Sequence, residues 1–82
     1  MFGLFGKSGF ESEKEELEKK FKTLGTEMMM AMNNFQLQKQ MNLLTSMADV
    51  CDELMYCCKK YGKFDEMRKW EEHKAKALSL RG

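Results

Sequence analysis

The chain has 82 residues, enough for one domain, and its formal net charge of +1 favours neither nucleic acid nor a strongly acidic partner. It contains no proline, no isoleucine and a single valine, whereas Leu, Met, Glu and Lys are abundant. No stretch alternates polar and β-branched residues, so the composition excludes a β-rich fold and predicts an all-α protein.

The first ten residues have an unusual composition for a chain terminus. Four large apolar residues are separated there by glycines: Phe2, Leu4, Phe5 and Phe10. Glycine at this density disfavours a helix, so we expect a flexible tail over residues 1–10 and a single helical domain over residues 11–82. Phe2, Leu4 and Phe5 are candidate partner-binding residues that insert into a groove or a membrane surface. The alternative is a tail that folds back on its own bundle.

A first helix is expected near residues 11–32. Ser12 and Glu15 have the spacing of a capping box, which favours a helix start at this point. One apolar row continues in phase along this segment: Leu17, Phe21, Leu24, Met28, Ala31 and Phe35. Because the row passes Gly25 without interruption, a turn at Asn33-Asn34 is favoured over a break at Gly25. Asn tolerates the left-handed backbone conformation that such a turn requires.

Methionines gather near the end of this first helix, at positions 28, 29, 30 and 32. Consecutive residues on a helix point about 100° apart, so the four side chains cannot all enter one core. Met29 and Met30 are therefore candidate partner-binding residues, since flexible and polarizable Met side chains adapt to different partners. The alternative is that the methionines fill the end of the bundle where the chain turns.

The central element is a helix expected over residues 35–60. At helical spacing it carries one apolar row of Leu37, Met41, Leu44, Ala48, Cys51, Met55 and Cys58, and an adjacent row of Leu43, Met47, Val50, Leu54, Cys57 and Tyr61. Together the two rows form an arc of roughly 160°, which needs neighbours on two sides. The pattern predicts a small antiparallel three-helix bundle with this helix at its centre. Packing of the arc between copies, as a homodimer or larger homo-oligomer, is the alternative.

A third helix is expected near residues 64–80. Gly62 suits the end of the preceding helix, and Asp65 and Glu66 favour a new helix start. Basic residues of this segment are interleaved with acidic ones, which argues against a nucleic-acid-binding stripe. Trp70, among basic neighbours, is a candidate residue for contact with a partner or a membrane surface. The alternative is a core position for its ring.

No pattern of catalytic, cofactor-binding or metal-binding residues is found. His73 is the only histidine, and Cys51, Cys57 and Cys58 lack the C-x-x-C spacing of a zinc site. There is no glycine-rich phosphate loop. We therefore expect a protein that is not an enzyme and has neither cofactor nor metal. An odd number of cysteines and the lack of a secretory signal indicate a cytoplasmic location.

The expected function is that of a small helical interaction module, which would act as an adaptor, a regulator or a chaperone-like subunit. It would bind a protein partner through exposed Met and Phe residues, and would suit a bacterial or phage accessory protein. One alternative is a peripheral membrane protein that uses the apolar tail and the basic C-terminal helix. A second alternative is a homo-oligomeric structural or assembly protein.

Overall fold

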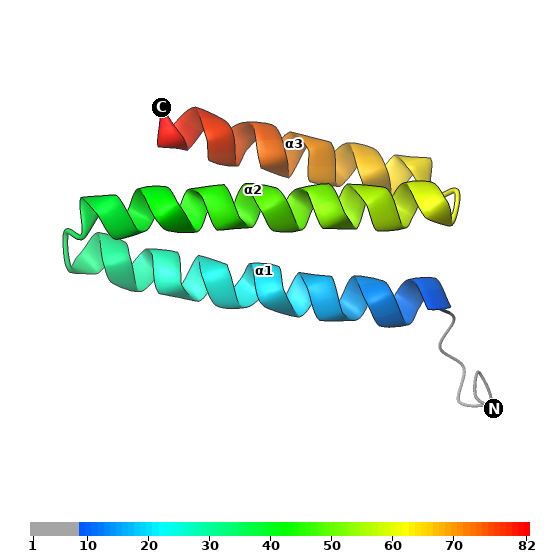
Figure 1. Ribbon diagram of the computed structural model, residues 1–82, viewed down its shortest axis with the longest axis horizontal. Helices are drawn as coiled ribbons and strands as arrows, with labels where there is room; N and C mark the ends of the chain where they lie inside the picture. Colours follow the sequence, from blue (N-terminus) through cyan, green and yellow to red (C-terminus); the bar gives the residue numbers. More distant parts are fainter. Residues whose placement is uncertain (1–8) are drawn as a thin grey trace.

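The computed structural model describes residues 9–82, which form three helices: α1 (Gly9–Asn33), α2 (Leu37–Lys60) and α3 (Phe64–Arg81). Short turns join them, successive helices run in opposite directions, and α2 lies between the other two (Figure 1). No strand occurs in the described part of the chain. The all-α three-helix bundle predicted from the sequence is confirmed.

The core is centred on α2, as its wide apolar arc predicts. Eight residues of this helix are buried: Leu43, Leu44, Ala48, Val50, Cys51, Leu54, Cys57 and Cys58. The larger cluster joins α2 to Phe10 of α1 and Trp70 of α3, and the smaller one joins Leu44 and Ala48 to Ala77 of α3. Both flanks of α2 are therefore covered, one by each neighbouring helix.

The helix α1 starts at Gly9, two residues before the predicted start, because Phe10 is a core residue. Its ring is buried and lies 5.6 Å from the ring of Tyr61, between ring centroids. One turn later, Glu13 accepts hydrogen bonds from the Tyr61 hydroxyl (2.6 Å) and from Lys60 Nζ (3.0 Å). Contacts with the end of α2 thus hold residues 9–10 in the helix, although the sequence assigns them to the tail.

The turn between α1 and α2 follows Asn33, and α1 passes through Gly25 without a break, as predicted. The left-handed residue of the turn is Phe35, with a φ of 55°, and neither Asn33 nor Asn34 has a positive φ. Hydrogen bonds fix this geometry, because the Phe35 N–H donates to the Met32 carbonyl (3.1 Å) and the Gln36 N–H to the Ala31 carbonyl (2.9 Å). At the next turn Gly62 supplies the positive φ of 72°, as its predicted position after α2 requires.

Candidate interaction surface

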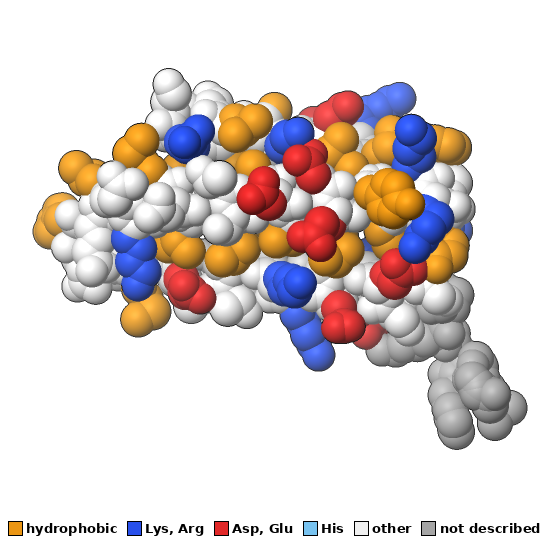
Figure 2. Space-filling view, viewed as in Figure 1, with side chains coloured by type: hydrophobic (Ala, Val, Ile, Leu, Met, Phe, Trp, Pro, Cys, Tyr) orange, Lys and Arg blue, Asp and Glu red, His pale blue; other side chains and the backbone are white. Residues whose placement is uncertain are grey.

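Large apolar side chains are exposed together at the end of the molecule that holds the α1–α2 turn. Six of them, which we call the apolar tip, keep 42–86 % of their surface exposed: Met29, Met30, Met32, Phe35, Leu37 and Met41. In Figure 2 hydrophobic side chains reach the surface at several separate places at this end, on the left of the view. No other part of residues 9–82 covers these side chains.

The α2 part of the tip is uncovered because α3 stops short of the turn (Figure 1). Along one row of α2, Leu44 and Ala48 are buried against Ala77 of α3. In the same row Leu37 and Met41, two turns and one turn nearer the tip, are 71 % and 42 % exposed. The sequence places these two residues in the core row, and this interpretation is wrong for them. A row of apolar side chains on one helix is buried only where a neighbouring helix lies over it.

The predicted partner-binding residues lie in different environments. Met29 and Met30 are both more than half exposed and belong to the tip. Phe2, Leu4 and Phe5 lie outside the described residues. Trp70, in contrast to the two methionines, is buried.

The ring of Trp70 is a core element, with only 5 % of the residue exposed. It packs edge-on against Phe21 at 5.3 Å and lies 5.1 Å from the ring of His73, between centroids. Trp70 therefore occupies a core position, which was the alternative interpretation of the sequence. Its ring is covered by α1 and is not exposed for contact with a partner. Its indole N–H is buried and has no hydrogen-bond acceptor among residues 9–82.

Sequence reasoning missed four residues of the tip: Met32, Phe35, Leu37 and Met41. Phe35 is the most exposed of all, at 86 %. A signal for it exists, since a large apolar residue directly after two asparagines stands where a turn is expected. Nothing local distinguishes Leu37 from Leu44, however, because both occupy the same row and differ only in whether α3 reaches them.

Exposed basic side chains lie on the parts of α2 and α3 nearest the tip. Lys39 lies in the first turns of α2, and Lys76 and Arg81 lie towards the end of α3; all three are exposed. The single Asp or Glu side chain in segments 26–46 and 73–82 is that of Glu27. The interhelical ion pairs of the described chain lie elsewhere, between Lys14 and Glu66, Lys60 and Glu13, and Lys74 and Asp52. The tip end therefore carries cations that no described carboxylate neutralises by an ion pair.

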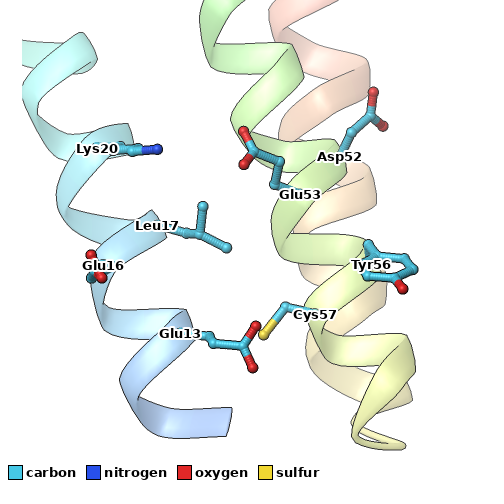
Figure 3. Close-up of a pocket in the computed structure, with 8 residues that line it drawn as sticks. All are labelled: Glu13, Glu16, Leu17, Lys20, Asp52, Glu53, Tyr56 and Cys57. Atoms are coloured by element: carbon cyan, nitrogen blue, oxygen red, sulfur yellow. The ribbon is translucent and has the colours of Figure 1, made fainter. Parts of the chain in front are cut away.

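A second concave surface lies between α1 and α2, away from the tip. This open groove of about 480 Å³ is lined by Glu13, Glu16, Leu17, Lys20, Asp52, Glu53, Tyr56 and Cys57. In Figure 3, Glu13 and Leu17 of α1 point towards Glu53 and Cys57 of α2. Two of its carboxylates already serve the fold, because Glu13 binds Tyr61 and Lys60, and Asp52 pairs with Lys74.

The chemistry of this groove is that of a packed helix interface. Hydrogen bonds from Tyr61 and Lys60 lower the pKa of Glu13, which keeps it ionised. Burial raises the pKa of the Cys57 thiol, whereas a nucleophilic cysteine needs a lowered pKa. Cys57 and Cys58 are both buried, although consecutive residues of a helix point in different directions. Both are covered because α2 lies between α1 and α3 at this point, and the same core cluster holds Phe10 of α1 and Trp70 of α3.

Two further properties concern the described residues as a set. No group of three or more His, Cys, Asp or Glu side chains within residues 9–82 is arranged to hold a metal ion. None of the three helices has a stretch both long and apolar enough to cross a membrane, over the residues that the structure describes.

Comparisons of this chain with protein-family models, with curated proteins and with solved structures find no match.

Proposed function

We propose that this protein is a non-enzymatic interaction module, an adaptor, a regulator or a chaperone-like subunit, that binds a protein partner through the apolar tip. The observation that carries the proposal is the exposure of six large apolar side chains at one end of the bundle. Exposed apolar side chains that gather on one part of a soluble protein mark interaction sites more often than apolar residues exposed singly. Four of the six are methionines, which adapt their shape to a partner.

The backbone at Phe35 supports a role for this side chain outside the fold. A left-handed conformation costs a non-glycine residue roughly 1–2 kcal/mol, and Asn or Gly would adopt it more easily. The ring of Phe35 recovers little of this cost by packing, since it is the most exposed large apolar side chain described. A strained backbone that carries an exposed aromatic ring is typical of a binding residue.

A cytoplasmic location forms part of the proposal. All three cysteines are buried and unpaired. Free thiols are the usual state of cysteine in a reducing compartment. The location is checked by fractionating native cells and probing for the tagged protein.

The test of the proposed function is an affinity capture of the tagged full-length protein from its native cells, with quantitative mass spectrometry. The wild type is compared with a double variant of the tip, Met30→Gln with Phe35→Asn. The matched control is Phe64→Gln, since Phe64 is also an exposed aromatic residue but lies at the opposite end of α3. We expect a stoichiometric protein that the control retains and that the tip variant loses by about tenfold or more, or about 1.4 kcal/mol.

Retention of the same partner by the tip variant would contradict the proposal. A Phe2→Ser with Phe5→Ser variant separates the two parts of the chain that sequence analysis singles out. If this variant alone loses the partner, binding belongs to the first ten residues and the tip is not the site.

Both alternative functions use the same exposed surface and give different results in solution. A peripheral membrane protein would float with vesicles that contain anionic lipid, because this end of the bundle exposes both apolar side chains and the basic residues Lys39, Lys76 and Arg81. A homo-oligomer would sediment as a dimer or larger species at micromolar concentration, and the tip variant would sediment as a monomer. Either result in the absence of a stoichiometric partner would replace the adaptor proposal.

A further inference from the structure

An open cavity of about 520 Å³ lies between α1 and α3. Its lining comes from the middle of α1 and the first half of α3, and it shares no residue with the apolar tip or with the groove between α1 and α2. Cavities that hold small molecules in proteins measure about 300–1,000 Å³. This cavity is therefore large enough for a small organic ligand.

Three aromatic rings form the apolar part of the cavity. Phe21 reaches across from α1, and its ring centroid lies 5.3 Å from that of Trp70 and 5.7 Å from that of His73. Phe21 is only partly buried and His73 is exposed, so both rings can contact a molecule in the cavity. A planar ring bound there would gain edge and face contacts with them, in addition to the area that it buries.

The indole N–H of Trp70 is an unused hydrogen-bond donor in the wall of this cavity. It is buried and has no acceptor among the described residues. Buried donors are nearly always paired, so this one calls for an acceptor that residues 9–82 do not supply. The side chains next to the indole ring are those of Lys69, with its Nζ 5.2 Å from the ring, and His73. Both are exposed and can move aside to let a ligand reach the N–H.

The charged groups of the cavity favour an anionic acceptor. Lys19, Lys22 and Lys69 line it, and all three are exposed and form no ion pair with a described carboxylate. Glu15 and Glu18 also line it, which leaves three positive side chains against two negative ones. A ligand carboxylate would accept hydrogen bonds from the indole N–H and from a lysine, whereas a ligand ammonium group would leave the indole N–H unpaired.

We propose that this cavity binds a small aromatic carboxylate. The ring of the ligand packs against Phe21 and His73. Its carboxylate accepts one hydrogen bond from the Trp70 indole N–H and charge-assisted hydrogen bonds from the lysines at the rim. Because the cavity is separate from the tip, the site adds a small-molecule ligand to the proposed function and does not depend on it.

The probes for this site are phenylacetate and phenylacetamide, which share a ring and differ in the charge of the acceptor. Trp70 is the only tryptophan of the chain, so the full-length, isotope-labelled protein gives a single indole N–H signal in a two-dimensional NMR spectrum. We expect phenylacetate to move this signal with a Kd of about 1 mM or tighter, and phenylacetamide to bind about tenfold more weakly. The difference should shrink as salt screens the lysines.

Variants of the protein locate the binding site. Lys22→Gln with Lys69→Gln should weaken phenylacetate about tenfold and leave phenylacetamide unchanged, and the fold should survive because both side chains are exposed. Lys39→Gln with Lys59→Gln removes the same charge outside the cavity and should change neither affinity. Trp70→Phe keeps a ring and removes the donor, so it should weaken phenylacetate about fivefold, measured from the backbone signals of the cavity residues.

An indole signal that stays in place at about 10 mM phenylacetate would overturn this inference. Equal affinity for the two probes, or binding that the Lys22 and Lys69 changes leave intact, would overturn it as well, since the carboxylate would then have no role. Shifts confined to the signals of tip residues would place the probe at the tip, with the same consequence. The proposed function is judged separately by the capture experiment, because that experiment changes only residues outside the cavity.

Discussion

At the scale of single residues, the left-handed Phe35 links stability to the proposed interaction. Replacement of Phe35 by Asn should raise the free energy of unfolding by about 1 kcal/mol, because Asn adopts a positive φ at lower cost. Urea unfolding followed by circular dichroism measures the change. Phe64→Asn, at an exposed position with ordinary φ, should bring no gain. A loss of stability in Phe35→Asn would show that the ring contributes to the fold.

The buried indole of Trp70 gives a second prediction at this scale. An unpaired buried donor costs about 1–3 kcal/mol, and this N–H has no acceptor within the described chain. Trp70→Phe removes the donor along with part of the packing, so we expect a net change within about 1 kcal/mol. Trp70→Ala, which leaves a cavity between Phe21 and α2, should cost about 3–5 kcal/mol. Thermal unfolding followed by far-ultraviolet circular dichroism compares the two variants. A large loss in Trp70→Phe would indicate that the N–H is bonded.

At the scale of elements, the start of α1 depends on one buried ring. Phe10 is the N-terminal member of the main core cluster, and its ring lies against that of Tyr61, directly after α2. Phe10→Ala should destabilise the protein by about 3–5 kcal/mol, a large part of what a core of this size provides. Phe64→Ala, at an exposed aromatic, should cost far less. Denaturant unfolding of both variants tests the difference, and equal losses would contradict the burial of Phe10.

The burial of Phe10 determines which truncation can test the role of the N-terminal residues. A truncation of residues 1–10 removes a core side chain and confounds any effect on binding with loss of stability. A truncation that ends before Gly9 leaves the described α1 intact, so binding assays of the tail should use that variant.

At the scale of the whole molecule, several interhelical groups have raised pKa values, so stability should fall at alkaline pH. Burial raises the pKa of the Cys51 thiol from 9.0 to about 11. Burial also raises the pKa of Cys57 and Cys58, and hydrogen bonds to carboxylates raise the pKa of Lys14 and Lys60.

The sign of the effect follows from proton binding. A group with a raised pKa in the folded state holds its proton there after the unfolded chain has released it. Its stabilising contribution is complete below the unfolded pKa and is lost as pH rises through the folded pKa. We therefore expect the urea midpoint to decline between pH 9 and about 11, and Cys51→Ala to decline less steeply. A midpoint that is constant over this range would contradict the prediction.

The same linkage predicts a smaller effect on the acid side. Glu13 has a lowered pKa, so its contribution is complete above the unfolded pKa of 4.5 and is lost as pH falls. Glu13 is solvent-exposed, and its ion pair with Lys60 is screened by water and salt. The alkaline decline should therefore be the larger of the two in the same series of urea titrations.

Local patterns in the sequence are sufficient for the helices and for the central place of α2. The absence of proline and of β-branched runs, two adjacent apolar rows and the phase that passes Gly25 all act over a few turns, where intrinsic propensity and periodicity decide. Met29 and Met30 are also predictable as exposed residues, because consecutive helical positions cannot share one core. These features depend on neighbours in the sequence, and the sequence alone determined them.

Only the tertiary structure decided which parts of those rows are covered. Leu37 and Leu44 have the same spacing and chemistry, but one is exposed and one is buried because α3 reaches only the second. Phe10 is a helix residue because Tyr61, fifty-one positions later in the chain, packs against it. Burial depends on where a distant helix ends and which distant ring approaches, and this information is spread over contacts that no local pattern contains.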